Sequence, residues 1–475
     1  MSQEQTHLLL PADSAWLALE RPDNPMTITV MLRVDGLTAP RLRSFLAHYW
    51  LAWERFRRVP VAGVAGWAWQ PDPQFDLRHH LDVALDRFTP AQLQDWVSAR
   101  LNQPLPRRRP LWKFWLAPNA EGGAALVLRL HHCYGDGMAL LSVFEQICPA
   151  SPRQPPAVYG APETGDLQRW LKAAQRWLAD SVGPVTGAGD AELVSAPNTS
   201  GADVPARALD LLERFTGNSL RLVHEASGLA VSAQDSPSAL RRPLLGRRQC
   251  RWSAPVPLTQ FRDVARAAHT TINDVLLACV TGALRERLQL SPEALEQAVL
   301  HGANPVDIRH RLPPELSPAP GQLGNGIGTV FVPLPVDGHS PLERLYRLKQ
   351  ETRRLKASWQ PGVAWALTAS AALLPEAVRR PAVDLLSRKA SAVISNVPGT
   401  SQPRYLAGCK ITEQMFWVPQ AGAIGLGISI VSYAGQVQFG VVADESILAG
   451  PEAFVVGCLA ELDALSGLLV QSTRR

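Results

Sequence analysis

Residues 126–137 read LVLRLHHCYGDG, and this stretch decides the fold because it joins an apolar run to two histidines and an acid. The run predicts a buried strand that ends at His131 and His132. After Asp136, apolar residues recur at helical spacing over 140–148, which predicts a helix. We therefore place both histidines at a strand-to-helix junction, where rigid elements on either side can hold side chains in a cleft.

Only one of the two histidines is expected to face that cleft. Successive side chains of a strand point to opposite faces, so His131 and His132 cannot both enter one cleft from a regular strand end. The pattern His-x-x-x-Asp-Gly begins at His132, which favours His132 as a general base and leaves His131 to shape the site. A neutral imidazole can accept the proton of an alcohol that attacks a carbonyl carbon, and can return it to a leaving thiolate.

Asp136 and Gly137 complete the pattern. Asp136 could orient structure around the imidazole, but we favour a buried structural acid that needs a cationic partner, because an unpaired buried carboxylate is costly. Gly137 is expected to permit a special backbone geometry or a close helix approach. A second pair, His79 and His80, lacks the glycine and the acid spacing, so two adjacent histidines alone are weak support for catalysis.

Length and composition indicate a large globular chain. Its 475 residues are 46% hydrophobic and 19% charged, which suits two domains with substantial cores. The net charge of +5 includes short basic clusters such as 107–109, which suit a phosphate-bearing ligand or an anionic membrane, or are simply solvated. Nucleic acid is disfavoured, because no basic stripe is interleaved with stacking aromatics.

The cysteines and the N-terminus favour a cytoplasmic protein. The six cysteines are scattered without metal-ligand spacing and are expected to be reduced thiols, so no metal site is predicted. The first residues, MSQEQTHLLLPADSAW, lack the features of a signal peptide. The apolar stretch 363–374 is shorter than the ~20 residues of a membrane span. Any membrane association is therefore expected to be peripheral.

The chain divides by composition into three segments. Residues 1–148 form an expected N-terminal domain with the histidine motif, and 247–475 form a C-terminal domain. The proline-rich and polar segment 149–246 predicts a crossover linker, with helical islands near 166–182 and 205–224 and a flexible part near 184–204. Mixed strands and helices in both halves predict an α/β, α+β layered fold with mixed sheets flanked by helices.

Individual elements follow from periodicity and turn residues. Strands are expected at 27–35, 249–256, 298–308, 327–334 and 390–395, with a hairpin at 427–433 and 436–442. Helices are expected at 41–58, 90–101, 258–268 and 451–469, and Thr89 is expected to cap the second of these. A further helix is expected to begin after its cap, Thr271. Helical stretches are also expected within 342–388, with breaks at Pro361, Pro375 and Pro381.

The motifs together resemble a known family. HHCYGDG resembles the HHxxxDG motif of the CoA-dependent acyltransferase superfamily. Further motifs make the chain similar to bacterial wax ester synthase/diacylglycerol acyltransferases: LLPADSAWLALERPDNPMTI near the N-terminus, PLW at 110–112, the pair Asn273 and Asp274, GN at 324–325, SNVPG at 395–399 and SYAGQVQFGVVAD at 432–444. Lys113 and Thr400 depart from the family pattern, which leaves the preferred acceptor open.

The resemblance implies two chloramphenicol-acetyltransferase-like domains with an active-site tunnel at their interface. In it, His132 would activate the hydroxyl of a long-chain fatty alcohol or diacylglycerol, which attacks the thioester of a fatty acyl-CoA directly. Acyl-CoA is then a substrate, and no cofactor or metal is implied. The resemblance also implies peripheral association with the inner membrane face or with lipid inclusions. The oligomeric state stays open.

The same resemblance suggests roles for other residues. Arg309 would pair with Asp136 across the domains, although an arginine at a strand end can also face solvent. Asn273 and Asp274 would bind substrate, but a polar pair at a helix start is also ordinary capping. Structural roles at the channel walls are implied for the other motif residues, namely Pro110, Leu111, Trp112, Asn396, Pro398 and Gly399.

Two other functions remain possible from sequence. A condensation-like domain would take its acyl group from a carrier protein, but the C-terminal motif and the lack of adjoining carrier or adenylation domains disfavour it. A catalytically silent lipid-binding protein would keep the fold, but His132, Asp136 and Gly137 are intact. Thiol release from palmitoyl-CoA with hexadecanol or diolein separates the three.

Overall fold

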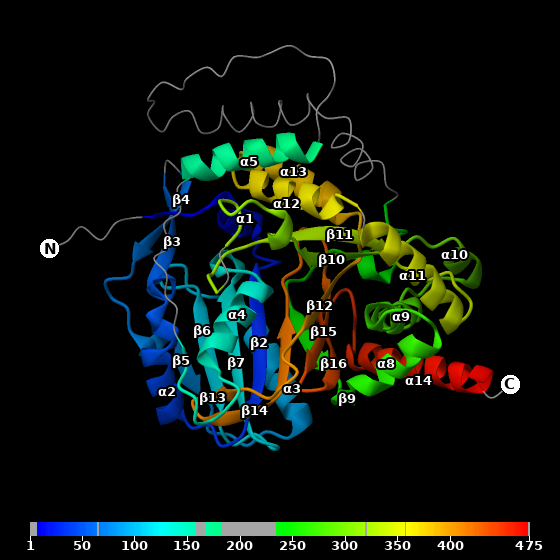
Figure 1. The fold of residues 1–475 in the computed structure, drawn as a ribbon, viewed down its shortest axis with the longest axis horizontal. Coiled ribbons are helices and arrows are strands. Elements are labelled where there is room, and N and C mark those ends of the chain that lie inside the picture. The colour runs from blue at the N-terminus through cyan, green and yellow to red at the C-terminus, as the bar shows by residue number, and fades with distance from the viewer. Residues whose placement is uncertain are drawn as a thin grey trace, which may run out of the picture.

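The computed structural model describes residues 7–63, 66–157, 167–182, 234–318, 321–356 and 358–473. The expected helix at 205–224 and the flexible part near 184–204 lie outside these residues. The first half of the chain gathers on one side of the molecule and the second half on the other, each around a mixed sheet flanked by helices (Figure 1). The predicted α/β layered class is confirmed.

The sheet of the first half carries the histidine motif. Its order is β13-β14-β2-β7-β6-β5, and only β5 and β6 pair in parallel. The central strand β7 (Ala124–His131) lies between β2 (Thr27–Val34) and β6 (Trp112–Ala117), with all of its residues buried. The remaining strands are β5 (Leu81–Val83), β13 (Tyr405–Leu406) and β14 (Cys409–Trp417). The expected strand at 27–35 is confirmed.

The sheet of the second half mixes parallel and antiparallel pairs. Its order is β11-β10-β12-β15-β16-β8, with β9 also paired to β16. β12 runs parallel to both of its neighbours. The strands are β8 (Arg248–Trp252), β9 (Val256–Pro257), β10 (His301–Asp307), β11 (Ile327–Pro333), β12 (Ala392–Pro398), β15 (Leu426–Tyr433) and β16 (Gln436–Asp444). They match the expected strands of this half, except that the single strand expected at 249–256 is divided into β8 and β9.

The two sheets are joined by strands that cross between the halves. β14 comes from the second half of the chain but pairs with β2 of the first sheet, from Trp417 opposite Thr29 to Ile411 opposite Val34. It also packs on β16, where a Cβ at Gly440 would lie 2.6 Å from Met415 Sδ. The sheets therefore do not separate at the boundaries expected from composition.

Helices flank the two sheets, some over their faces and others across the ends of their strands (Figure 1). In the first half these are α1 (Pro11–Leu19), α2 (Ala39–His48), α3 (Pro90–Leu101) and α4 (Gly137–Ile147). The second half contributes α8 (Leu258–Ala267), α9 (Ile272–Arg285), α10 (Pro292–Glu296), α11 (Pro341–Lys356), α12 (Gln360–Ala371), α13 (Glu376–Ser387) and α14 (Glu452–Thr473). From the linker, α5 (Leu167–Val182) packs Trp170 and Trp177 against Trp365 of α12.

Two helix predictions were wrong in detail. The expected helix over 41–58 ends at His48, and short 3-10 helices Trp50–Ala52 and Glu54–Arg57 follow, because Trp50 and Phe56 leave the helical path to stack on each other at 3.8 Å. The expected break at Pro381 does not occur, because α13 continues through it. Pro361, in contrast, lies in the first turn of α12, where its missing N–H is not needed.

Other local predictions are confirmed. Thr89 and Thr271 cap α3 and α9 with complete capping boxes. The hairpin turn places Ala434 and Gly435 at positive φ of 48° and 78°, as a tight two-residue turn requires. All six cysteines are buried and free. A small third sheet joins β1 (His7–Leu8), β4 (Gly66–Pro71) and β3 (Arg58–Gly63).

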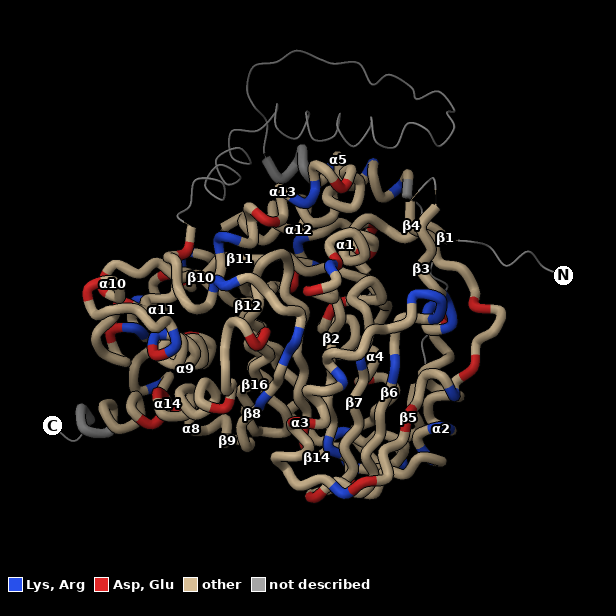
Figure 2. The backbone as a smooth tube through the Cα atoms, turned by 180° about the vertical axis from the view of Figure 1, so that it is seen from behind, with Lys and Arg blue, Asp and Glu red and all other residues tan. Residues whose placement is uncertain are grey.

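Charges of both signs are interspersed along the chain in Figure 2. Among the helices that the structure describes, none is long and apolar enough to cross a membrane. The same residues contain no group of three or more side chains suited to hold a metal ion.

Candidate active site

The histidine motif forms a strand, a turn and a helix, as its sequence predicts. β7 ends at His131, a 3-10 turn runs over His132–Tyr134, and α4 begins at Gly137. The backbone N–H of His132 donates to Met26 O at 2.8 Å, which ties the turn to the start of β2. The histidines are thus held between a central strand and a helix.

His132 is enclosed by aromatic and polar groups. Its side chain is buried, and Trp16 of α1 stacks on the imidazole with ring centroids 3.6 Å apart. Its Nδ1 is also buried and has no hydrogen bond. Burial, with the adjacent His131 in second place, lowers the pKa of His132 to about 3, while the nearby Asn325 side chain acts in the opposite direction. The imidazole is therefore neutral near neutral pH, as a proton acceptor must be.

His131 has a different set of contacts. Its Nδ1 accepts a hydrogen bond from the backbone N–H of Cys133 at 3.1 Å, which caps the 3-10 turn. Its Nε2 lies 3.6 Å from Glu20, and Glu20 in turn forms an ion pair with Arg107. Burial, followed by the charge of Arg107, lowers the pKa of His131 to about 3. These contacts support a structural role for His131.

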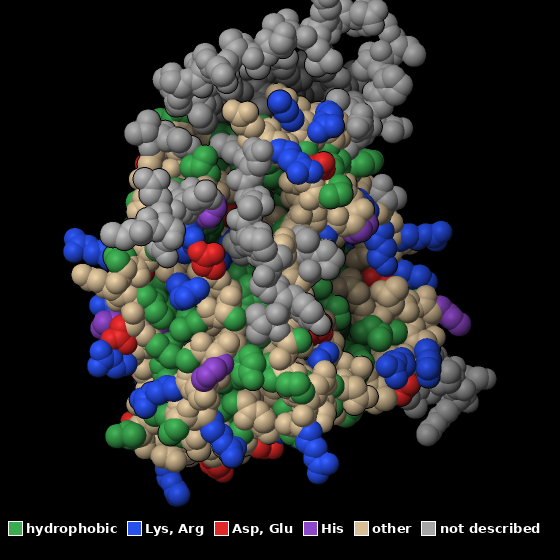
Figure 3. All heavy atoms as spheres, turned by 60° about the vertical axis from the view of Figure 1, so that its left-hand side comes forward, with side chains coloured by type: hydrophobic (Ala, Val, Ile, Leu, Met, Phe, Trp, Pro, Cys, Tyr) green, Lys and Arg blue, Asp and Glu red, His purple; other side chains and the backbone are tan. Residues whose placement is uncertain are grey.

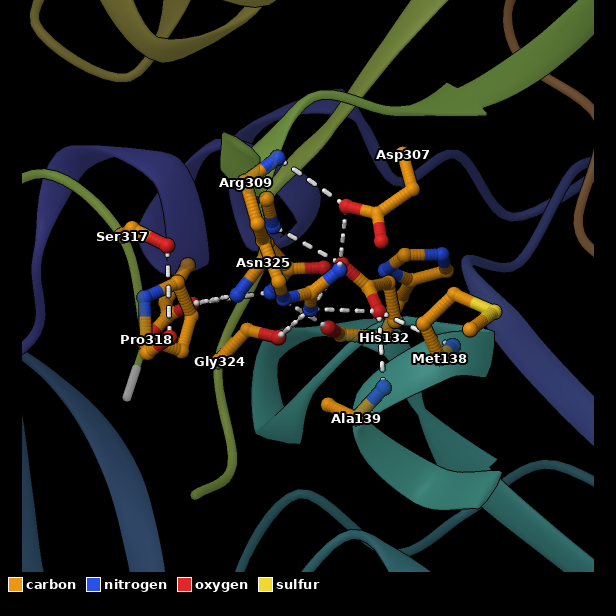
Figure 4. A network of polar contacts seen from close by, with 12 residues as sticks. His132, Met138, Ala139, Asp307, Arg309, Ser317, Pro318, Gly324 and Asn325 are labelled. Carbon is orange, nitrogen blue, oxygen red and sulfur yellow. Dashed lines mark hydrogen bonds and ion pairs between the residues drawn. The ribbon is translucent and has the colours of Figure 1, made fainter. Parts of the chain in front are cut away.

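Asp136 and Arg309 form the ion pair that the sequence suggested (Figure 4). Arg309 Nη2 lies 2.8 Å from Oδ1 and 2.7 Å from Oδ2 of Asp136, whose side chain is fully buried. Asp136 also caps α4 by accepting from the N–H groups of Met138 and Ala139, and it accepts from Gly326 N at 2.8 Å. The carboxylate is thus satisfied from both halves of the chain. Burial alone would lower the pKa of Arg309, but the charges of Asp136 and Asp307 outweigh burial and raise this pKa.

The expectation for Gly137 is wrong. It occupies the first position of α4 without a positive φ, and a Cβ there would meet no atom within 4 Å. The close approach occurs instead at Gly135, where a Cβ would lie 3.1 Å from Gly324 N. The contact is made by the turn before the helix, because that turn is where the second half of the chain packs.

Three polar residues behind His132 were not identified from the sequence, and Figure 4 shows one of them, Asn325. Asn325 Nδ2 donates to the backbone oxygen of His132 at 3.1 Å and to Asp13 Oδ1 at 2.8 Å. Arg55 Nη1 lies 3.2 Å from Asp13 Oδ2 and donates to Tyr134 O at 3.0 Å. The 3-10 turn is therefore bound at His132 by Asn325 and at Tyr134 by Arg55.

The sequence offered a partial signal for this group. Asn325 belongs to GN at 324–325 and Asp13 and Trp16 to LLPADSAW, both quoted above for the family resemblance but without a role for these residues. A polar residue inside the apolar turn of a helix, such as Asp13, is one such signal, because a buried carboxylate needs partners. No comparable sequence feature distinguishes Arg55.

Pro110, Leu111 and Trp112 support the motif through the backbone. His131 N donates to Leu111 O at 2.9 Å, and Leu111 N donates to the Tyr134 hydroxyl at 3.0 Å. Trp112 is buried and donates from Nε1 to Phe56 O, and His80 Nδ1 bonds the Trp112 carbonyl. His80 is thus occupied by backbone contacts, whereas His79 lies in the neighbouring short 3-10 helix.

Asn273 and Asp274 form a separate group at the start of α9. Asp274 accepts hydrogen bonds from Thr271 N and from the hydroxyls of Thr270, Thr271 and Thr352, which together keep its pKa low although burial opposes this. Asn273 Oδ1 accepts from Asn396 Nδ2 at 3.0 Å, which links α9 to β12. Asp274 is therefore a cap, and only Asn273 has a side chain that joins two motifs.

Pro398 and Gly399 lie at the end of β12. Pro398 pairs with Ser432 of β15, and a Cβ at Gly399 would lie 2.4 Å from Ser432 O. Gly399 therefore permits close packing of backbone on backbone. Among the described residues, no hydrogen bond joins this group or Asn273 to His132.

A cavity of about 540 Å³ adjoins the polar group behind His132. Its walls come from the N-terminal residues 7–13, from β4 and α5, and from 314–318 and 322–325 of the second half, and they include Asp13, Arg55 and Asn325. It thus lies between the two halves of the chain. The tunnel implied by the resemblance stays a prediction.

Solved structures share this fold: the wax ester synthase/diacylglycerol acyltransferase of Marinobacter aquaeolei VT8 superposes with a TM-score of 0.65 at 20% identity, over 98% of this chain and 99% of its own. A trichothecene 15-O-acetyltransferase of Fusarium sporotrichioides gives 0.62 at 11% identity, over 97% and 95%.

Sequence comparison identifies the family. The chain belongs to the wax ester synthase/diacylglycerol acyltransferase family: its catalytic-domain model matches residues 9–276 and its C-terminal-domain model matches 323–466. A Mycobacterium bovis protein named for diacylglycerol O-acyltransferase activity is 28% identical over 450 residues, 90% of this chain and 85% of its own. The tgs1 protein of Mycobacterium tuberculosis, named for the same activity, is 27% identical over 416 residues, 86% and 82%. The chain is an acyltransferase.

Proposed function

We propose that this protein transfers a long-chain fatty acyl group from CoA to diacylglycerol, to a long-chain alcohol, or to both. The observation that carries the proposal is a buried, neutral His132 in the HHxxxDG turn of a chain that belongs to this family. The relatives named for diacylglycerol O-acyltransferase activity support the acceptor class.

In the proposed reaction, His132 is the general base. The imidazole accepts the hydroxyl proton while the alcohol oxygen attacks the thioester carbonyl carbon. The tetrahedral intermediate then expels the thiolate, which takes the proton from the imidazolium. An ester and free CoA are formed, and His132 returns to its neutral form without a covalent enzyme intermediate. Enclosure by Trp16 keeps water from competing with the alcohol.

A direct test follows thiol release from palmitoyl-CoA with hexadecanol, with diolein and without acceptor. We expect acceptor-dependent release that produces the matching ester and is lost in His132→Ala. Release that requires a carrier-bound acyl group would favour condensation-like chemistry. Tight lipid binding without turnover would favour a silent lipid-binding protein.

We further propose that the protein works at a lipid surface through α13. Val378 and Leu385 are 53% and 50% exposed on this helix, which also carries Arg380 and is followed by Arg388 at its C-cap. Elsewhere on the molecule, Figure 3 shows a face on which hydrophobic and charged side chains are interspersed. An amphipathic helix such as α13 suits the interface of an anionic bilayer.

Flotation with phosphatidylglycerol vesicles tests this surface. We expect the protein to float with the vesicles and the Val378→Glu/Leu385→Glu variant to remain below. Val456→Glu, at a similarly exposed position on α14, is the matched control and should float. Equal flotation of both variants would reject α13 as the docking helix.

A further inference from the structure

The polar group behind His132 is built around the amide of Asn325. Both hydrogens of Nδ2 are used, one by Asp13 Oδ1 and one by the backbone oxygen of His132. The backbone N–H of Asn325 donates to the same Asp13 oxygen at 3.0 Å. These three bonds fix which end of the amide faces which neighbour.

The fixed amide leaves two buried polar atoms without a hydrogen bond of standard geometry, Asn325 Oδ1 and His132 Nδ1. The Asn325 side chain and the backbone oxygen of His132 both lie close enough to the imidazole to raise its pKa against the effect of burial. The two residues are already in contact through Asn325 Nδ2 and His132 O. An amide oxygen is an acceptor only, whereas an imidazole nitrogen becomes a donor when it carries the proton.

The group is rigid because it is anchored in both halves of the chain. Asp13 and Arg55 come from the first half and are 2% and 8% exposed. Asn325 lies between Gly324, whose oxygen accepts from Asp136 N, and Gly326, whose N–H donates to Asp136 Oδ2. The loop 324–326 therefore holds both ends of the motif, His132 and Asp136.

We propose that Asn325, held by Asp13, is a positioning residue that selects the His132 tautomer with the proton on Nδ1. Its Oδ1 accepts the Nδ1 proton as the imidazole settles against the substrate. Nε2 is then left with its lone pair and accepts the proton of the alcohol. This inference rests on the proposed role of His132 as the base.

A histidine that exchanges between two tautomers acts as a base only in the tautomer whose unprotonated nitrogen faces the substrate. Asn325→Ala removes the acceptor and frees the imidazole. We expect kcat to fall about 10- to 100-fold, within the range that a general base contributes. The KM values for acyl-CoA and acceptor should stay within about twofold, because neither substrate loses a contact.

Tautomer detection by ¹⁵N NMR supplies a readout that a merely structural role would not move. In histidine-labelled protein, the His132 signals are assigned by their loss in His132→Gln. We expect a protonated Nδ1 and a bare Nε2 in the wild type, and a mixture of tautomers in Asn325→Ala. Asp13→Asn keeps an oxygen for Asn325 to donate to, so this variant should retain the wild-type tautomer and lose less activity than Asn325→Ala.

Asn102→Ala is the matched control. Asn102 also donates its amide N–H groups to two backbone oxygens, those of Ser98 and Arg248, and also joins the two halves of the chain. We expect it to keep wild-type kcat and the wild-type tautomer. A wild-type kcat or an unchanged tautomer in Asn325→Ala would overturn the inference, and so would an equal kcat loss in Asn102→Ala. If His132→Ala is inactive in either case, the proposed function stands, whereas an active His132→Ala would remove both.

Discussion

Asp136 and Arg309 meet through a single guanidinium nitrogen that contacts both carboxylate oxygens, at 2.7 and 2.8 Å, from the N-cap of α4 and the 3-10 turn that follows β10. The carboxylate is fully buried, whereas the arginine is 20% exposed. The pair therefore couples the start of α4 to the end of β10. It does so directly beside the turn that carries His132.

Arg309→Met should destabilise the protein by about 3 kcal/mol, because it leaves a buried carboxylate without its cation. Urea unfolding measures this loss. Adding Asp136→Asn to the variant should recover part of it, since the amide removes the buried charge and still caps α4. An unfolding free energy within about 0.5 kcal/mol of the wild type in Arg309→Met would contradict the coupling.

The two histidines should differ sharply on substitution. His132→Ala should remove nearly all turnover and lower the melting temperature only slightly, because the side chain makes no hydrogen bond of standard geometry and loses chiefly its stack on Trp16. His131→Ala should be milder in activity but less stable, since it loses the acceptor for Cys133 N. His131→Asn restores an acceptor and should recover stability. Equal inactivity of the two alanine variants would refute the assignment of a single base.

Gly135 and Gly137 provide a second matched pair. Gly135→Ala should lower stability and activity, because its Cβ would press on the backbone of Gly324. Gly137→Ala should keep the wild-type melting temperature, since its Cβ meets open space at the first position of a helix. Thermal denaturation of both variants compares them. The reverse order of stability would show that the glycine of the motif has the backbone role after all.

Stability should depend on pH through buried histidines. His131 and His132 have pKa values lowered to about 3, and burial lowers that of His80 to about 4. In the unfolded chain these histidines become protonated near pH 6.5, whereas in the folded protein they stay neutral to a much lower pH. The free energy of unfolding is therefore largest above pH 6.5 and falls as the pH decreases towards 4. Each histidine contributes up to about 1.4 kcal/mol per pH unit. Urea unfolding between pH 7 and 5 should show this slope, reduced by one histidine's share in His80→Gln.

Asp274 and Asn273 should separate into a structural and a substrate-linked residue. Asp274→Ala should cost about 2 kcal/mol, since it removes a capping box and a buried acceptor. Asn273→Ala should change stability little and raise the KM for acyl-CoA. Unfolding curves and initial rates measured on both variants decide the matter. A KM effect confined to Asp274→Ala would reverse the two roles.

The local part of the site could be predicted from sequence. The strand, turn and helix around His132 and the caps of α3 and α9 arise from neighbours within a few residues, which periodicity and capping patterns record. The contact of Asp136 with Arg309 was suggested by resemblance and not by spacing. It lies 173 residues apart in sequence, beyond the reach of any local pattern.

The remaining features depend on long-range packing. Asn325 meets Asp13 across 312 residues, and no periodicity marks such a contact. The end of α2 at His48 is decided by the stacking of Trp50 on Phe56, which overrides a continuous helical pattern. The prediction for Gly137 was wrong because the close approach of backbone that we assigned to this glycine is made by Gly135, two residues earlier.

The crossing of β14 has a consequence for synthesis on the ribosome. β2, which flanks the histidine strand, has β14 as its outer partner, and β14 ends only at Trp417. While the nascent chain is shorter than this, β2 presents an open edge that can pair with other chains. The sheet that carries His132 therefore remains incomplete, with one strand edge exposed, until most of the protein has been translated.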